Sequence, residues 1–434
     1  MLPLLNEVWR IPRDIVSDGY DRALYRLAQE YPLTVHEYPT GTPVWTWRIP
    51  EKWTCDEAVL ETLDGRVLLS YADHPLHAVS YSLPFDGVVA RDELLRHLHV
   101  HPTLPNAIPF VFKYYERDWG LCATQTLRAT LTEAAYRVRI RTRFEPGSLK
   151  VGEIFLGGER PETFVIAAHL CHPAMVNDDL TGVLVALELA KALRKLPSLR
   201  YSYRFLIVPE TIGSVAYLSH NEDKIPNMVG GLFLEMLGND SPHALQTSFQ
   251  PHSQADKTLV SALKGLDAAA YVGAYRTVIG NDERQFNAPG VRVPMLSLSR
   301  VEPPTSATRP YREYHSSEDT PAIVTEARLR DSLRVAVGLV AAWEQNAYVV
   351  NNFRGEVFAS GYGIWIDYRT DPEGHRALFL VMEHCDGQHT VADIAIKLGI
   401  SFQTVWRVVT LLRDKGLVWL SDVPVETRVR REMP

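Results

Sequence analysis

The segment that most constrains the fold joins a buried strand to a run of polar residues. Residues 164–168 are all apolar, which is typical of a strand that is buried on both faces. The imidazoles of His169 and His172 follow at once, and Asp178 comes shortly before the Thr-Gly pair at 181–182, where an apolar helix is expected to begin. Open α/β sheets bind ligands at the carboxyl ends of their strands, and imidazole with carboxylate is a ligand set that zinc takes. The segment therefore predicts an α/β fold with a zinc site at a strand end.

The composition is that of an ordinary globular protein. The chain has 434 residues, 46% of them hydrophobic and 22% charged, and this length predicts about two to four domains. A net charge of −7 argues against a nucleic-acid-binding surface over the whole molecule. The four cysteines lie far apart, which excludes a disulfide framework and a thiolate zinc cluster. Because the sequence shows no secretion signal and no apolar run of about 18 residues, we expect a cytoplasmic protein without a membrane span.

The pattern of apolar and turn-forming residues changes twice along the chain. From about residue 121 to 345, strands alternate with helices, which predicts a mostly parallel sheet flanked by helices. Between 42 and 118, short runs of Val, Trp, Tyr and Leu are broken by Pro and Gly, as in a compact β-rich module. We therefore predict a main domain of residues 1–41 and 119–348, with residues 42–118 inserted as a β-rich domain.

Residues 349–434 are predicted to form a winged helix-turn-helix domain. Thr390 caps one helix, Gly399 ends it, and Ser401 caps a second helix that a short strand follows. Residues 351–434 hold 10 Lys or Arg and 11 Asp or Glu, a balance of 10 − 11 = −1, whereas phosphate contacts dominate DNA affinity. We therefore expect no nucleic-acid partner, and favour protein–protein contact or homo-oligomer formation through this domain or the inserted one.

Further polar residues follow the later apolar runs. Glu210 and Glu235 each come directly after a predicted strand. A polar loop contains Asp282, Glu283 and Arg284, and an acidic loop further on holds His315 in front of a helix. We expect these distant side chains to meet around one divalent cation, because strand ends of an α/β sheet share one edge.

In order and residue type these segments resemble the zinc-dependent exopeptidases of the M28 type. The spacing from Asp178 to Gly182, the Glu-Met-Leu-Gly sequence at 235–238 and the Tyr-His-Ser-Ser-Glu-Asp-Thr loop at 314–320 carry the resemblance, which covers about residues 121–345. The whole chain resembles a narrower group, the DUF4910/DUF2172 proteins with an aminopeptidase-like domain. The Cys-His-Pro, Glu-Thr-Ile-Gly-Ser and Asp-Glu-Arg-Gln sequences that begin at 171, 210 and 282 are shared with it.

The resemblance implies a zinc-exopeptidase-like (phosphorylase/hydrolase-like) fold, in which a mostly parallel sheet flanked by helices carries the inserted β-rich domain and the winged helix. The sequence departs from the M28 pattern at two places. The usual His-x-Asp reads His169-Leu-Cys171, and the usual Glu-Glu pair is the single acid Glu210 between Pro209 and Thr211. The site is therefore expected to hold one or two zinc ions, and the number stays open.

The resemblance and the donor types together assign roles to the polar residues. The predicted metal ligands are His169, His172, Asp178, Glu235 and His315. The M28 spacing favours His169 and the Cys-His-Pro sequence favours His172, so the choice between the two imidazoles stays open. Asp178 could instead cap a helix, Glu235 could be a buried acid paired with Arg, and His315 could brace its loop.

Glu210 is the predicted catalytic residue, because a carboxylate near zinc can take a proton from the attacking water. It could instead be a second-metal ligand or only structural. Asp282, Glu283 and Arg284 are predicted to bind the substrate through its amino and carboxylate groups. We thus predict a zinc-dependent amide hydrolase, an aminopeptidase-type exopeptidase for a small peptide or aminoacyl conjugate, with a link to polysaccharide or small-molecule biosynthesis suggested by the resemblance. The alternative is a catalytically decayed peptidase-like scaffold with a binding or regulatory role.

Overall fold

A large mixed sheet lies at the middle of the molecule. The computed structural model describes residues 1–426, and its largest sheet has the strand order β1-β10-β12-β11-β13-β16-β14-β15. The strands are β1 (Thr34–Pro39), β10 (Ser148–Leu156), β11 (Thr163–His169), β12 (Ser202–Val208), β13 (Met228–Glu235), β14 (His243–Gln246), β15 (Tyr271–Gly273) and β16 (Met295–Arg300). The central strands β12, β11, β13 and β16 are parallel to one another. The α/β fold class predicted from the sequence is thus confirmed.

Helices pack on this sheet and close its core. They are α1 (Leu2–Val8), α2 (Asp18–Ala28), α5 (Leu180–Leu193), α6 (Ile212–Ser219), α7 (Gln254–Leu266), α8 (Glu283–Asn287) and α9 (Glu326–Gln345), with the 3₁₀ turns η2 (Glu222–Asn227) and η3 (Pro321–Ile323). Helix α5 packs on β11, β12 and β13 and against α9, while α7 packs on β13, β16 and α9. Every residue of β11, β12 and β16 is buried, which explains their continuous apolar sequences.

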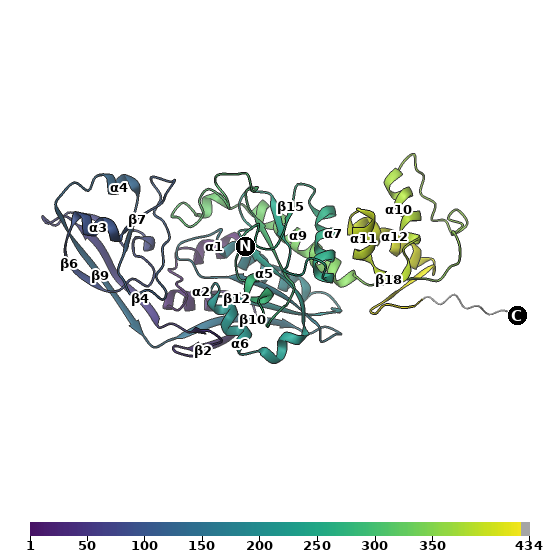
Figure 1. The fold of residues 1–434 in the computed structure, drawn as a ribbon, viewed down its shortest axis with the longest axis horizontal. Helices are drawn as coiled ribbons and strands as arrows, with labels where there is room; N and C mark the ends of the chain where they lie inside the picture. The colour runs from purple at the N-terminus through teal and green to yellow at the C-terminus, as the bar shows by residue number, and fades with distance from the viewer. Residues whose placement is uncertain (427–434) are drawn as a thin grey trace.

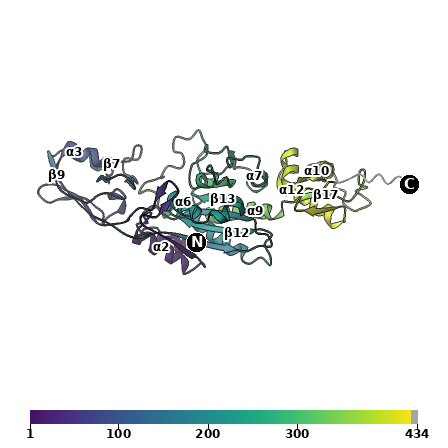
Figure 2. The ribbon, with the colours of Figure 1, turned by 60° about the horizontal axis from the view of Figure 1, so that its bottom comes forward.

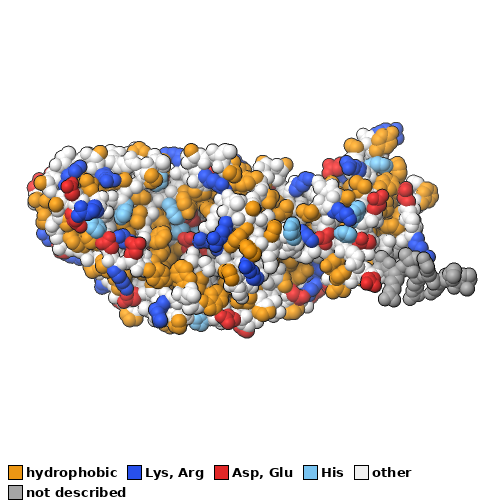
Figure 3. All heavy atoms as spheres, in the orientation of Figure 1, with side chains coloured by type: hydrophobic (Ala, Val, Ile, Leu, Met, Phe, Trp, Pro, Cys, Tyr) orange, Lys and Arg blue, Asp and Glu red, His pale blue; other side chains and the backbone are white. Residues whose placement is uncertain are grey.

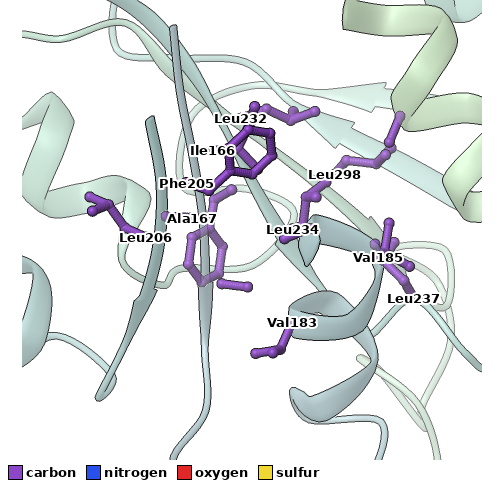
Figure 4. Close-up of a cluster of buried hydrophobic side chains, with 14 of the residues drawn as sticks. Ile166, Ala167, Val183, Val185, Phe205, Leu206, Leu232, Leu234, Leu237 and Leu298 are labelled. Carbon is purple, nitrogen blue, oxygen red and sulfur yellow. The ribbon is translucent and has the colours of Figure 1, made fainter. Parts of the chain in front are cut away.

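The side chains at the centre of the sheet interdigitate with those of α5. Ile166, Phe205 and Leu232 come from three neighbouring strands, and Val183 and Val185 extend from α5 (Figure 4). Asp179 caps α5 through a hydrogen bond of 2.9 Å from the N–H of Gly182. A Cβ atom at Gly182 would lie 2.3 Å from the carbonyl oxygen of Leu234, so only glycine lets α5 begin this close to β13.

A second, antiparallel sheet lies at one end of the molecule, with the order β5-β4-β9-β6. Its strands are β4 (Lys52–Glu61), β5 (Val67–Ser70), β6 (Phe85–Ala90) and β9 (Ala135–Glu145). Around it lie the hairpin β2 (Pro43–Val44) and β3 (Trp47–Arg48), the parallel pair β7 (Leu98–Val100) and β8 (Leu121–Ala123), helices α3 (Arg91–His97) and α4 (Gln125–Ala129), and η1 (Pro75–His77).

The position of β9 differs from the sequence-based expectation. Residues 119–145 were expected to belong with the main sheet, yet β9 pairs with β4 and β6 along its whole length. Because β9 also leads directly into β10 of the large sheet, the chain passes from one sheet to the other near residue 147. The β-rich part therefore extends beyond the predicted limit at residue 118.

The C-terminal part lies at the opposite end, and the three parts form a row (Figures 1 and 2). It contains α10 (Pro372–Met382), α11 (Val391–Leu398) and α12 (Phe402–Asp414), with β17 (Tyr348–Asn351), β18 (Asp386–Thr390) and β19 (Val418–Ser421) in a three-stranded sheet. The predicted caps are present at Thr390, Gly399 and Ser401. The first turn of α12 faces α7, since Gln403 donates a hydrogen bond of 3.1 Å to the carbonyl oxygen of Ala262.

Charged side chains of both signs are interspersed over the face shown in Figure 3. None of the helices within residues 1–426 combines the length and the apolar character that crossing a membrane requires.

Candidate metal centre

The loop that follows β11 carries the centre of the site and is anchored by one buried carboxylate. Asp319 accepts hydrogen bonds from the backbone N–H groups of Val176 (3.3 Å), Asn177 (2.8 Å) and Asp178 (3.1 Å). Asp319 accepts a fourth hydrogen bond, from the hydroxyl of Tyr311, at 2.8 Å. Asp319 thereby fixes the position of Asp178 relative to the loop that carries His315.

Three imidazoles surround the carboxylate of Asp178. The Nε2 atom of His169 lies 2.9 Å from Oδ1, whereas Nδ1 of His172 and Nε2 of His315 lie 3.4 and 3.0 Å from Oδ2. The other ring nitrogen of His172, Nε2, lies 3.1 Å from a carboxylate oxygen of Glu210. The structure thus brings together five of the predicted site residues, although 146 positions separate the first from the last in the sequence (315 − 169 = 146).

The polar atoms on one side of Asp178 have the character of metal ligands. Oδ2 of Asp178, Nδ1 of His172 and Nε2 of His315 are buried and lack a hydrogen-bond partner within the described part of the chain. Leaving such atoms unpaired costs about 1–3 kcal/mol each. Ligand atoms of His169, His172 and Asp178 lie within 4.8 Å of one another, close enough to share a metal ion, and Nε2 of His315 lies 3.0 Å from Oδ2 of Asp178. Imidazole and carboxylate are donors that zinc takes, so the donor set fits a zinc ion.

On the other side of Asp178, around Oδ1, the neighbouring polar atoms are hydrogen-bonded. Nδ1 of His169 lies 3.1 Å from Oδ1 of Asn281, and the amide nitrogen of Asn281 donates to the carboxylate of Glu235. Glu235 is fully buried, and burial raises its pKa well above the usual value. The structure therefore places Glu235 behind Asn281 rather than beside Asp178. Asn281 itself lies within the polar loop noted in the sequence, but its residue type gave no signal for this role.

The electrostatics favour a positive charge at the centre. Burial alone would raise the pKa of Asp178, but the charge of His172 and the hydrogen bond from His169 outweigh it and hold the pKa well below the usual value. Burial alone would also raise the pKa of Glu210. The hydrogen bond with His172 outweighs burial and lowers this pKa to about 2. Both carboxylates are therefore ionised at neutral pH, as metal ligands and general bases require.

Strained backbone is concentrated at these residues. His172, Thr211 and His315 have φ values of +97°, +62° and +52°, which are unusual for residues other than glycine. Thr211 forms the centre of a tight turn in which the N–H of Ile212 donates to the carbonyl oxygen of Glu210 at 2.7 Å. The N–H of Glu210 is held in turn by Sγ of Cys171, at 3.0 Å. Strain of this kind is typical of functional sites, and here it directs the carboxylate of Glu210 toward His172.

The predicted substrate residues lie in a different place from the one expected. Asp282 and Glu283 are fully buried: Asp282 accepts the N–H of Thr211 at 2.9 Å, and Glu283 accepts the N–H of Asn281 at 2.8 Å. Burial also raises the pKa of Glu283 to about 7. These bonds leave both acids behind the metal centre, so the structure argues against their direct contact with a substrate. The Nε atom of Arg284 donates to the carbonyl oxygen of Asn281 at 2.7 Å.

The β-rich part reaches the metal centre through residues 108–110. Backbone hydrogen bonds join Ile108 to Ser317 (2.9 Å) and Phe110 to His315 (2.8 Å). The ring of Phe110 meets the rings of His172 and His315 edge-on, with centroid distances of 5.1 and 5.4 Å. The centre remains open beside this contact, since the side chains of His315 and Glu210 are 27% and 29% exposed.

Comparisons with known proteins identify relatives of this chain. A protein of Clostridium acetobutylicum, described as a candidate polysaccharide biosynthesis protein with an aminopeptidase-like domain, is 32% identical over 93% of this chain and 92% of its own. A crystal structure of a candidate peptidase from the same organism is 31% identical, with a TM-score of 0.86 over 96% of this chain and 95% of that one.

A zinc aminopeptidase from Bacillus subtilis shares the fold, with a TM-score of 0.57, 15% identity and coverage of 78% of this chain and 93% of its own. The family model described as "Domain of unknown function (DUF4910)" matches residues 3–346. This match covers the large sheet, the β-rich part and the candidate metal centre together, and the chain therefore belongs to the DUF4910 family.

Proposed function

We propose that the protein is a zinc-dependent hydrolase of amide bonds, an aminopeptidase-type exopeptidase that acts on a small peptide or aminoacyl conjugate. The observation that carries the proposal is that three buried atoms without a hydrogen-bond partner lie side by side: Oδ2 of Asp178, with Nδ1 of His172 at 3.4 Å and Nε2 of His315 at 3.0 Å. The peptidase-like relatives and the shared fold support the same class of reaction. The description of the Clostridium relative supports a substrate connected with polysaccharide biosynthesis.

In this proposal His172, Asp178 and His315 hold the metal ion. When bound, zinc supplies Lewis acidity that polarises a carbonyl group and lowers the pKa of a coordinated water toward about 7. In the structure the two ring nitrogens of His169 lie within hydrogen-bond distance of Asp178 and Asn281. We therefore assign His169 a positioning role for Asp178, with Glu235 orienting Asn281 from behind.

Glu210 is the proposed general base. Its carboxylate lies at the open side of the centre, where a water can reach it, and Oε2 contacts Nε2 of His172. The hydrogen bond with His172, followed by the charge of His172, outweighs burial and lowers the pKa of Glu210 to about 2, so Glu210 is ionised and can accept a proton. Glu210 then accepts the proton of the attacking water and returns it to the leaving amine.

The first test is the metal content of the full chain purified without chelator. We expect one zinc per chain, lost in Asp178→Asn and retained in His169→Gln. Hydrolysis of aminoacyl p-nitroanilides follows as the second test, in which Glu210→Gln is expected to lower kcat by about 10²–10⁴ while zinc remains bound. A protein that binds no zinc, or a Glu210→Gln variant with full activity, would contradict the proposal.

One observation favours the alternative of an inactive binding scaffold. The sequence has Cys171 and the single acid Glu210 where the M28 pattern has a carboxylate and a Glu-Glu pair. A chain that binds zinc but hydrolyses none of the p-nitroanilides, at any pH between 6 and 9, would support this alternative.

A further inference from the structure

A cavity of about 330 Å³ opens beside Glu210, at the junction of the main sheet and the β-rich part. Glu210, Thr211 and Ile212 border it on the side of the main sheet. The opposite wall consists of aromatic residues of the β-rich part, namely Trp47, Phe112, Tyr114 and Tyr115. Junctions between domains are common positions for ligand cavities, and this volume lies within the range of about 300–1,000 Å³ that such sites have.

Contacts of the aromatic side chains with one another and with the β2–β3 hairpin hold this wall of the cavity in place. The rings of Phe112 and Tyr114 stack at a centroid distance of 4.5 Å, and Trp47 meets Tyr115 edge-on at 6.0 Å. The hydroxyl of Tyr115 donates to the carbonyl oxygen of Arg48 at 3.1 Å, which joins this segment to the β2–β3 hairpin. The wall is therefore held in place before any ligand binds.

These rings are nevertheless exposed to solvent. Trp47, Phe112 and Tyr115 are 39%, 48% and 54% exposed, although each could bury a large apolar area. Three exposed rings around one cavity next to the proposed general base indicate a surface that is completed by a ligand.

The charges around the cavity exclude an acidic ligand group. Lys113 is the cation in the lining, and its ammonium group is neutralised by Asp118 at 2.5 Å, with Glu116 at 3.9 Å. Glu210 and Glu116 add two carboxylates to the same lining. The cavity therefore suits a group that is apolar or aromatic and lies next to a positive charge.

We propose that this cavity binds the aromatic side chain of the substrate's N-terminal residue, whose carbonyl carbon is the one attacked, so that the enzyme selects aminoacyl groups of the phenylalanine and tyrosine type. This inference rests on the proposed function. It assigns to the β-rich part the choice of substrate, through Trp47 and Phe112, while the main sheet supplies the metal centre and Glu210.

The test uses the zinc-loaded full chain and two amino alcohols that cannot be hydrolysed, L-phenylalaninol and L-alaninol. Calorimetry is expected to give at least a thirtyfold lower Kd for L-phenylalaninol, because the larger side chain fills an apolar pocket. Trp47→Ala and Phe112→Ala should each reduce this ratio at least fivefold without loss of zinc. Trp47→Phe, which keeps a ring, should restore most of it.

Trp45→Ala is the matched control. Trp45 lies on the same hairpin and is 42% exposed, but its Nε1 donates to Glu222 at 2.5 Å and it does not line this cavity. Its replacement should leave the ratio unchanged. Equal Kd values for the two alcohols, or a ratio that Trp47→Ala leaves intact, would overturn the inference.

The two proposals fail in different ways. Selective binding of L-phenylalaninol without hydrolysis of any aminoacyl p-nitroanilide upholds the cavity and refutes the hydrolase. Hydrolysis that is as fast for alanine as for phenylalanine p-nitroanilide, in kcat/KM, upholds the hydrolase and refutes the cavity.

Discussion

Replacing Asp319 with alanine tests how the metal centre is held. The carboxylate accepts four hydrogen bonds, three of them from backbone N–H groups of the loop that ends at Asp178. Burial, which these bonds oppose, raises the pKa of Asp319 to about 7, so the carboxyl group is about half ionised at pH 7. Hydrogen bonds contribute about 0.5–1.5 kcal/mol each to a neutral group and about 1.5–3 kcal/mol each to a charged one. For a half-ionised acceptor, the expected loss of all four bonds is therefore about 4–9 kcal/mol.

The measurement is the thermal unfolding of the zinc-loaded full chain at pH 7. A loss of about 5 kcal/mol should lower Tm by about 10–20 °C in a domain of this size. Because the loop positions Asp178, we also expect zinc affinity to fall by about 10–100-fold, measured by competition with a chelator. The affinity readout separates a positioning role from a general loss of stability.

Two variants serve as controls for Asp319→Ala. Glu318→Ala removes a neighbouring acid that pairs with Arg312 at the surface, at 3.0 Å, and should cost less than about 1 kcal/mol. Tyr311→Phe removes one of the four bonds and should have a smaller effect than the loss of the carboxylate. If Asp319→Ala melted within 3 °C of the wild type and bound zinc equally well, the reasoning on this loop would be refuted.

Three further outcomes follow from the structure. Removal of zinc by a chelator should lower Tm and zinc alone should restore it, since binding at a thousandfold excess over Kd stabilises the fold by about 4 kcal/mol; an unchanged Tm would argue against a metal bound by the folded state. Burial, followed by the charge of His77, lowers the pKa of His74 to about 4, and Nδ1 of His74 accepts the N–H of Leu76. The folded chain therefore binds fewer protons than the unfolded chain at this position. As a result, the free energy of unfolding falls as pH drops from about 6.5 to 4. His74→Asn should therefore reduce the fall in unfolding free energy between pH 7.5 and 5 by about 2 kcal/mol, seen as a smaller shift in Tm or in hydrogen exchange at η1; an identical pH dependence would contradict this. Gly182→Ala should destabilise the main domain by several kcal/mol, because its Cβ meets the carbonyl oxygen of Leu234 at 2.3 Å, and a wild-type melting curve would show that α5 can shift away from β13.

The sequence predicts the large sheet and most of the metal centre for a definite physical reason. Strands buried on both faces have continuous apolar sequences, so residues 164–168 and 203–208 mark β11 and β12. The polar residues that follow such strands lie at one edge of the sheet, which brings His169 near Asp178 and Glu210 near His172. A single sequence is therefore enough to predict which polar residues follow a buried strand.

The remaining errors concern which partner a residue faces. The alternating pattern of β9 shows that one face is buried but not against which sheet, and β9 pairs with β4 rather than with β10. Glu235 follows a strand as the other acids do, and only the fold shows Asn281 between it and His169. Nor does the spacing of Trp47 and Phe112 reveal that they line one cavity. Each of these contacts depends on tertiary packing that local sequence does not encode.

The backbone bonds that join residues 108–110 to the His315 loop bear on how this architecture can be rearranged. Exchange of the β-rich part between homologous proteins would cut a bridge between Pro109 and Ser316 and remove the ring that packs on two imidazoles. A chimera must therefore take residues 104–118 and 311–320 from the same parent. The proposed selectivity and the proposed metal binding would then be inherited together, so recombination could not change the specificity of this fold without also changing the His315 loop.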